Sequence, residues 1–201
     1  MARKRPSRPI TTTENVLNIQ DYLRYKNYRD YMLFLIGVTT GYRAGDLVTL
    51  RVRDIKEALR RKEFTIYEGK KMNTKNIREK NRKPRTVELI PELAKILKEY
   101  IKDKRDYEYL FQSRKGINKA IGVQAVSNII KDAAEYFGLY DITAHSMRKT
   151  YAYKIYIESG RDIVAVKELL GHSSIEETKR YIGLDREKYH QYSRSLSDFV
   201  R

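Results

Sequence analysis

TAHSMRKTYAYKIYIESGRDIVAVKELLGHSSIEETKRYIG, residues 143–183, is the most informative part of this 201-residue chain. It holds three short patterns in order: HxxR at His145 and Arg148, LGHSS at residues 170–174, and TxxY ending at Tyr181. His145 and Arg148 stand three apart at a predicted helix start, so they share a face. The positive end of the helix dipole favours an anion there. The stretch therefore predicts a phosphate-binding site with a tyrosine nearby.

The tyrosine falls on a short predicted helix. Two serines at positions 173 and 174, each followed three residues later by a glutamate, form a capping box that starts a helix over residues 175–182. The apolar face of this helix leaves Tyr181 at its edge, where a side chain can meet a substrate. His172, just before the cap, can donate a hydrogen bond to an anion. The alternatives are ordinary packing for Tyr181, one of 17 tyrosines, and a structural capping role for His172.

Composition favours a polyanionic partner. The chain has 42 Lys plus Arg against 26 Asp plus Glu, a net charge of +16 and a pI near 9.8, so double-stranded DNA is the expected partner. The longest apolar run, Tyr31 to Val38, is too short to span a bilayer, and the basic amino terminus is not followed by the apolar segment of a signal peptide. We therefore expect no membrane role, and a cytoplasmic, nucleoid-associated location.

A metal site is not predicted. The chain has no cysteine, which excludes disulfides and cysteine ligands. The three histidines, including His190, do not stand at the spacing of a known ligand motif.

Periodicity predicts an α+β fold, mainly α-helical, in a single domain with one small antiparallel sheet. Helical spacing of apolar residues or helix-start and helix-end signals predict helices over residues 13–25, 28–40, 46–50, 91–104, 123–137, 146–158, 162–170, 175–182 and 186–200. Alternation predicts strands over 63–68 and 85–90. Gly41 suits a left-handed end for the second helix.

Two basic segments are candidate DNA contacts. Residues 1–10, with Arg3, Lys4 and Arg5, are predicted to form a flexible arm that lies along DNA or simply adds solubility, while residues 11–201 form the domain. Between the strands, residues 69–85 hold eight basic residues and one acid, which predicts a DNA-contacting finger or a solvated loop. Its candidate contacts are Lys71, Lys75, Arg78, Lys80, Arg82, Lys83 and Arg85.

Taken together, HxxR, LGHSS and TxxY resemble the carboxy-terminal signature of the tyrosine recombinases. The resemblance extends to TGYRAGDL at residues 40–47, which matches the family's TGxRxxD form, and it covers about residues 11–200. It implies that Arg43 is a second phosphate clamp beside Arg148 and that Asp46 holds the cluster in place. The expected fold is the catalytic domain of this family.

The resemblance also implies a reaction. Tyr181 would attack a DNA phosphate to form a covalent 3′-phosphotyrosine, with His172 bonded to the phosphate and His145 assisting proton transfer at the phenol. The family's general acid is a lysine after the first strand. Lys70 matches best, and Lys71 and Lys75 remain alternatives because the loop is long. No metal or nucleotide cofactor is implied, and the biological setting is DNA recombination or integration, as in mobile genetic elements.

Two other functions remain open at this stage: a type IB topoisomerase-like enzyme that relaxes DNA, and a DNA-binding regulator that keeps the fold without activity. Members of the family usually carry a DNA-binding domain before the catalytic one, whereas only the ten-residue arm precedes it here, so the chain is either a fragment or a short member. The family acts as a tetramer on DNA. The predicted helix over 185–200 would dock on a neighbouring protomer or pack on its own domain.

Overall fold

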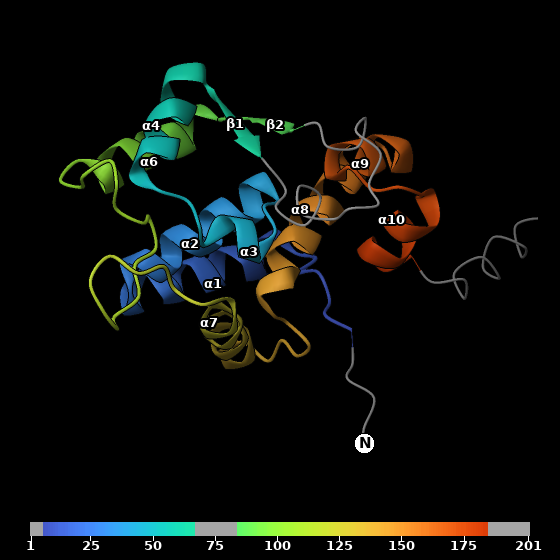
Figure 1. Cartoon of the computed structure of the whole chain (residues 1–201). Coiled ribbons are helices and arrows are strands. Elements are labelled where there is room, and N and C mark those ends of the chain that lie inside the picture. Colours follow the sequence, from blue (N-terminus) through green and yellow to red (C-terminus); the bar gives the residue numbers. More distant parts are fainter. Residues whose placement is uncertain (1–5, 67–83, 185–201) are drawn as a thin grey trace, which may run out of the picture.

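Helix α2 (Tyr28–Thr40) lies at the centre of the computed structural model, which describes residues 6–66 and 84–184 (Figure 1). Every residue from 30 to 37 is buried. Helix α1 (Thr13–Lys26) and helix α8 (Ala144–Glu158) pack against it. A Cβ atom on Gly37 would lie 2.6 Å from the sulfur of Met147, so glycine lets α2 and α8 approach closely.

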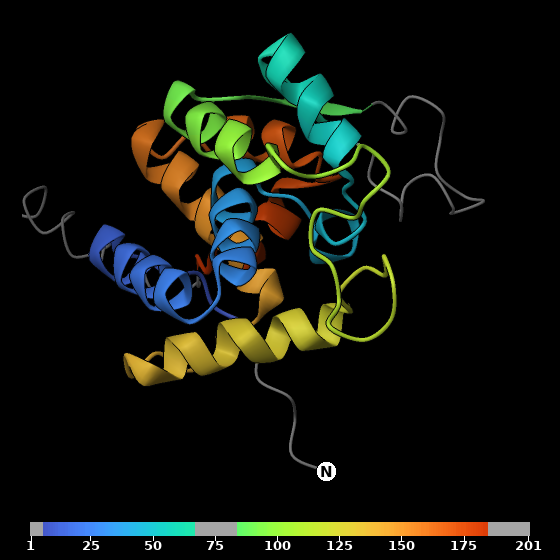
Figure 2. The ribbon, with the colours of Figure 1, turned by 90° about the vertical axis from the view of Figure 1, so that its left-hand side faces the viewer.

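A second group of elements surrounds the small sheet. Strands β1 (Glu63–Ile66) and β2 (Arg85–Glu88) run antiparallel, with Phe64 opposite Val87. Helix α4 (Val52–Arg61) packs against β1 and against helix α6 (Pro91–Ile101). Helix α7 (Val123–Tyr136) closes the opposite side of the molecule against α1, α2 and α8, as Figure 2 shows.

The C-terminal helices pack on α8. Helix α9 (Ile163–Leu170) and helix α10 (Ile175–Ile182) surround a small apolar cluster of their own. Its buried members are Tyr151, Ala152, Val166, Leu170 and Ile182. Because α8 touches both α2 and this cluster, residues near its N-terminal end can reach the C-terminal end of α2 and the helix of Tyr181.

The predicted fold class is confirmed, since the described residues are mainly helical with one two-stranded antiparallel sheet. Several predicted boundaries differ from the observed ones. The helix predicted from 46 to 50 is α3 (Ala44–Leu47), the helix predicted to end at 104 ends at Ile101, the helix predicted from 146 begins at Ala144, and the second strand ends at Glu88. The predicted end of the first strand lies outside the described residues. Helix α4 was not predicted, because only Val52, Ile55 and Ala58 form its buried face among charged residues. The predicted helix over 186–200 lies outside the described residues.

Residues 6–10, the described part of the predicted arm, lie against α8. Ile10 is buried, and its N–H donates to the hydroxyl of Thr150 over 2.8 Å. Arg8 pairs with Asp141 in the loop before α8, through its N–H to the carbonyl and its guanidinium to the carboxylate. Among the described helices, none is long and apolar enough to cross a membrane.

Candidate active site

Arg148 joins two helix ends from the interior. It lies on α8 and is 1% exposed, and its guanidinium donates to the Gly41 carbonyl over 2.7 Å and to the Leu170 carbonyl over 2.8 Å. Both acceptors are at the carboxyl ends of helices, α2 and α9, where backbone carbonyls carry partial negative charge. These bonds use two of the five N–H groups of a guanidinium and hold its plane fixed. A fixed, buried cation is suited to binding a phosphate oxygen.

Tyr181 lies between two imidazole rings. The ring centroid of His145 is 5.0 Å from that of Tyr181, and that of His172 is 4.8 Å away, both in edge-on geometry. His145 is exposed and Tyr181 is half-buried, so the site opens to solvent on this side, while His172 is buried at 8% exposure. Three predicted site residues from three separate sequence patterns therefore meet around one phenol. The TxxY helix that carries it begins where predicted, with Ser174 as its cap.

Thr178, three residues before Tyr181, orients the His172 ring. The Nδ1 atom of His172 lies 3.0 Å from the hydroxyl of Thr178, and that hydroxyl lies 3.2 Å from the Ser174 carbonyl. If the hydroxyl donates its one proton to the carbonyl, Nδ1 must donate to the hydroxyl. The proton of a neutral ring is then on Nδ1. In that arrangement His172 donates from Nε2 to a phosphate only as an imidazolium.

Glu177 ties the loop of His172 to the helix of Tyr181. Its carboxylate accepts hydrogen bonds from the N–H and the hydroxyl of Ser173, each 3.1 Å long. Burial acts to raise the pKa of Glu177, but these hydrogen bonds and the positive charges of His172 and Arg43 outweigh it and hold the pKa below its usual value.

The loop that carries Arg43 is braced by two arginines. Gly41 adopts a left-handed conformation with φ of 64°, and its carbonyl accepts from Arg85 over 3.1 Å as well as from Arg148. Arg85 also donates to the Thr40 carbonyl over 2.9 Å. Arg85 was predicted as a DNA contact, and the structure shows its guanidinium turned towards this loop. Arg43 follows as the N-cap of α3, and Asp46 lies in the first turn of α3.

Several predicted residues lie outside the described part of the chain. They are the candidate general acids Lys70, Lys71 and Lys75, and the candidate DNA contacts Arg3, Lys4, Arg5, Arg78, Lys80, Arg82 and Lys83. In the described ranges, no three His, Asp or Glu side chains are grouped in a way that could hold a metal ion.

One residue at the site was missed by sequence reasoning. The ammonium of Lys149 lies 5.3 Å from the ring centroid of Tyr181, and it donates to the Ser7 carbonyl over 2.7 Å. Burial lowers the pKa of Lys149. The signal was present in the sequence, because Lys149 follows His145 by four residues and so shares its helix face.

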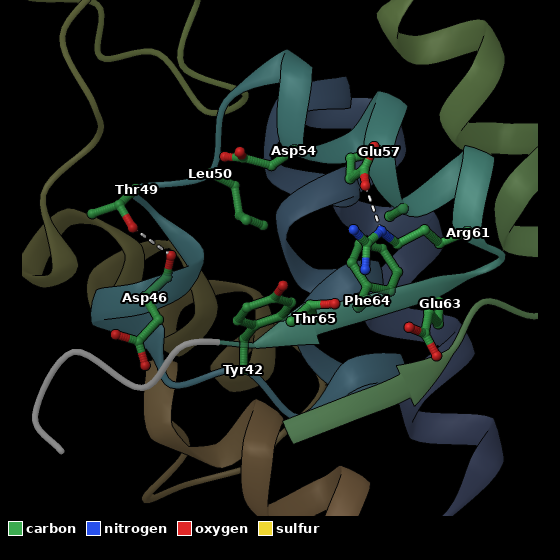
Figure 3. Close-up of a pocket in the computed structure, with 11 residues that line it drawn as sticks. Tyr42, Asp46, Thr49, Leu50, Asp54, Glu57, Arg61, Glu63, Phe64 and Thr65 are labelled. Carbon is green, nitrogen blue, oxygen red and sulfur yellow. Dashed lines mark hydrogen bonds and ion pairs between the residues drawn. The ribbon is translucent and has the colours of Figure 1, made fainter. Parts of the chain in front are cut away.

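A separate pocket of about 300 Å³ lies on the other side of α3, between α4 and β1 (Figure 3). Four carboxylates line it, those of Asp46, Asp54, Glu57 and Glu63, with Arg61 as the one cation among its lining residues. This excess of negative charge repels phosphate. The lining of this pocket does not include the candidate site residues Arg148, His145, His172 and Tyr181.

Comparison with known proteins adds independent information. The family model described as "Phage integrase family" matches residues 9–188. The probable integrase/recombinase YoeC of Bacillus subtilis is 32% identical over 179 residues, which cover 89% of this chain and 91% of YoeC. The tyrosine recombinase XerC of Roseiflexus castenholzii is 32% identical over 171 residues, which cover 81% of this chain but 49% of XerC.

A similar fold occurs in the crystal structure of the XerH site-specific recombinase bound to its palindromic difH substrate in a post-cleavage complex. The TM-score is 0.62 at 22% identity, and the match covers 94% of this chain and 53% of the XerH chain. The chain thus spans about nine-tenths of YoeC, and about half the length of XerC and of the XerH chain.

Proposed function

Because the chain belongs to the phage integrase family, whose members include the tyrosine recombinases, we propose that it is a site-specific DNA recombinase or integrase that cuts and rejoins duplex DNA through Tyr181. The observation that carries the proposal is the position of this phenol between the imidazoles of His145 and His172. Arg148, on the same helix as His145, is buried and bonded to the carbonyl of Leu170, two residues before His172. The net charge of +16 supports DNA as the substrate.

In the proposed reaction the phenol oxygen of Tyr181 attacks a backbone phosphorus. A new bond forms between that oxygen and phosphorus, the bond from phosphorus to the 5′-oxygen breaks, and the product is a 3′-phosphotyrosine with a free 5′-hydroxyl. The phenolic proton passes to His145, which is the more exposed of the two neighbouring imidazoles. Lys70 supplies a proton to the departing 5′-oxygen, with Lys71 and Lys75 as alternatives. A 5′-hydroxyl from another strand reverses these steps and rejoins the DNA.

The charge that develops on the phosphate is balanced by three groups. Arg148 and Arg43 provide guanidinium forks for the non-bridging oxygens, and His172 provides a hydrogen bond from Nε2. Asp46, in the first turn of α3, holds Arg43 in place. Since these side chains supply the positive charge and the ester conserves the bond energy, the proposed reaction needs neither a metal ion nor ATP.

Recombination joins two duplexes, so we also propose that the protein self-associates on DNA. The relative solved with DNA is a recombinase in a post-cleavage complex with its difH substrate, which supports binding of duplex DNA by this fold. We propose that residues 11–201 form the catalytic domain and that the basic residues of 3–5 and 71–83 contact the DNA backbone.

The test is covalent trapping on nicked DNA. The protein is incubated with duplexes from its genomic neighbourhood that carry a nick next to the candidate cleavage point, so that the short released strand diffuses away and the intermediate persists. A denaturing gel should show a protein–DNA band with the wild-type chain and none with Tyr181→Phe, while both bind the DNA with equal affinity. A band of equal strength with Tyr181→Phe would refute the role of this tyrosine.

The same assay separates the recombinase from a relaxing enzyme. Supercoiled plasmid carrying two copies of the trapped site should yield recombinant circles. Relaxation without any recombinant product would instead assign the protein as topoisomerase-like.

A further inference from the structure

The ammonium of Lys149 contacts two separate parts of the chain, the ring of Tyr181 and the carbonyl of Ser7. One contact is to the candidate nucleophile, with the ammonium 5.3 Å from the ring centroid of Tyr181. The other is to the segment that leads into the domain, with the ammonium donating to the Ser7 carbonyl over 2.7 Å. The side chain is half-buried, so neither contact is that of a freely moving surface lysine.

A cation next to an aromatic ring attracts the ring electrons. This attraction strengthens when the ring carries negative charge, as it does when a phenol loses its proton and its oxygen attacks phosphorus. The rings of His145 and His172 are also placed against Tyr181, and Glu177 is bonded to Ser173, next to His172. Lys149 adds an ammonium group to this set.

Residues 7–10, the segment that leads into the domain, are held by three interactions. These interactions fix the position of the Ser7 carbonyl as an acceptor. Arg8 is bonded to Asp141, and the N–H of Ile10 donates to Thr150, the residue that follows Lys149. Ile10 is also buried in the main core at 4% exposure. The position of the ammonium therefore depends on a segment whose Ser7 is 142 residues away in sequence.

We propose that Lys149 is a positioning residue for Tyr181: tied to the Ser7 carbonyl, its ammonium holds the phenol ring and favours the negative charge that forms during attack, so the segment entering the domain controls the nucleophile. This inference rests on the proposed function. It assigns a role to the residue after HxxR and to residues 7–10. Any contact with protein or DNA that displaces the Ser7 carbonyl would then change the rate of cleavage.

The experiment measures the single-turnover rate of covalent band formation on nicked DNA, together with DNA affinity, at a temperature where melting curves show every variant folded. Lys149→Met removes the charge and keeps the length, and should slow band formation by about 10- to 100-fold with DNA affinity unchanged within about 2-fold. Lys149→Arg restores a cation and should recover most of the rate. Lys154→Met is the matched control on the same helix, since Lys154 is exposed and pairs with Glu158, and it should cleave at the wild-type rate.

A double-mutant cycle tests the entering segment. Thr150→Val removes the acceptor of the Ile10 N–H while keeping the side-chain shape, so it should loosen residues 7–10 and slow cleavage in the wild-type background. In the Lys149→Met background it should have no further effect on the rate, because the ammonium that the segment positions is gone. Equal slowing in both backgrounds would overturn the link to the segment.

Two other outcomes overturn the role of Lys149. One is a wild-type cleavage rate for Lys149→Met. The other is a loss of DNA affinity in proportion to the loss of rate, with a smaller salt dependence of binding, which would show a phosphate contact instead. A wild-type chain that forms no covalent band refutes the proposed function and this inference together, whereas a normal wild-type band with an unaffected Lys149→Met variant refutes this inference alone.

Discussion

Replacing Arg148 should destabilise the folded protein, and this loss of stability must be separated from any effect on catalysis. Arg148→Ala removes two hydrogen bonds in the interior, those from the guanidinium to the carbonyls of Gly41 and Leu170, and leaves only the 3.1 Å bond from Arg85 to the Gly41 carbonyl. A hydrogen bond to a charged group contributes about 1.5–3 kcal/mol, so the loss of both should cost about 3–6 kcal/mol of unfolding free energy. Domains of this kind are stable by only about 5–15 kcal/mol. The variant should therefore be marginal, and inactivity of Arg148→Ala would not by itself show a role in phosphate binding.

The measurement is urea unfolding followed by circular dichroism, with a thermal scan beside it. At about 2–4 °C per kcal/mol for a chain of this size, Arg148→Ala should lower Tm by about 6–24 °C. Arg148→Lys keeps the charge but reaches only one of the two carbonyls, so it should lose about half as much. Arg53→Ala is the control, because Arg53 is exposed with a weak 3.9 Å pair to Asp54, and it should stay within about 0.5 kcal/mol of wild type.

An Arg148→Ala variant within about 1 kcal/mol of wild type would refute this reasoning. It would mean that the two carbonyls find other donors when the guanidinium is removed. Cleavage by Arg148→Lys should be measured at a temperature where its folded fraction equals that of wild type. If the cleavage rate is still reduced at that temperature, the loss reflects weaker interaction with the phosphate and not loss of folded protein.

Three further predictions concern the rest of the site. Thr178→Val removes the fully buried hydroxyl that is hydrogen-bonded to His172 Nδ1. The variant should lower the unfolding free energy by about 1–3 kcal/mol in urea and slow covalent band formation, and an unchanged stability would mean that this hydrogen bond contributes nothing. The pKa of Glu177 is held below its usual value, so its stabilising effect is complete above the unfolded value of 4.5 and is lost as the pH falls through the lowered folded value. Melting curves of wild type and Glu177→Gln should therefore differ at pH 7 and converge in acid, below the folded pKa, whereas a constant difference would contradict the assigned shift. Lys70→Ala should slow cleavage far more than Lys71→Ala on the nicked substrate, and the reverse order would move the general acid by one residue.

Much of the candidate site could be predicted because its signals are local. The helix of Tyr181 was predicted over its observed range, residues 175–182, since its start depends on a serine cap and a glutamate three residues later. The left-handed end of α2 at Gly41 was predicted from one residue type. Helix α4 was missed because its buried face is narrow, and an amphipathic pattern of three residues among charges is weak evidence for a helix.

The roles of the basic residues were harder to predict, because charge alone does not say what a long side chain reaches. Arg85 was assigned to DNA from its place in a basic run, yet its guanidinium donates to the carbonyls of Thr40 and Gly41. Lys149 was not singled out at all, although it lies against the ring of Tyr181, the candidate nucleophile. Both contacts depend on where the backbone of another segment happens to pass.

The sequence by itself determined the chemical types at the site, the short helix that carries Tyr181, and the positive charge that favours DNA. Each of these follows from residue identity or from hydrogen bonds between residues a few positions apart. Only the tertiary structure decided that Arg148 bridges the ends of α2 and α9 and that Lys149 connects Tyr181 to Ser7. Those contacts join residues separated by up to 142 positions, and they exist because residues 7–10 and helices α2, α9 and α10 all pack against α8.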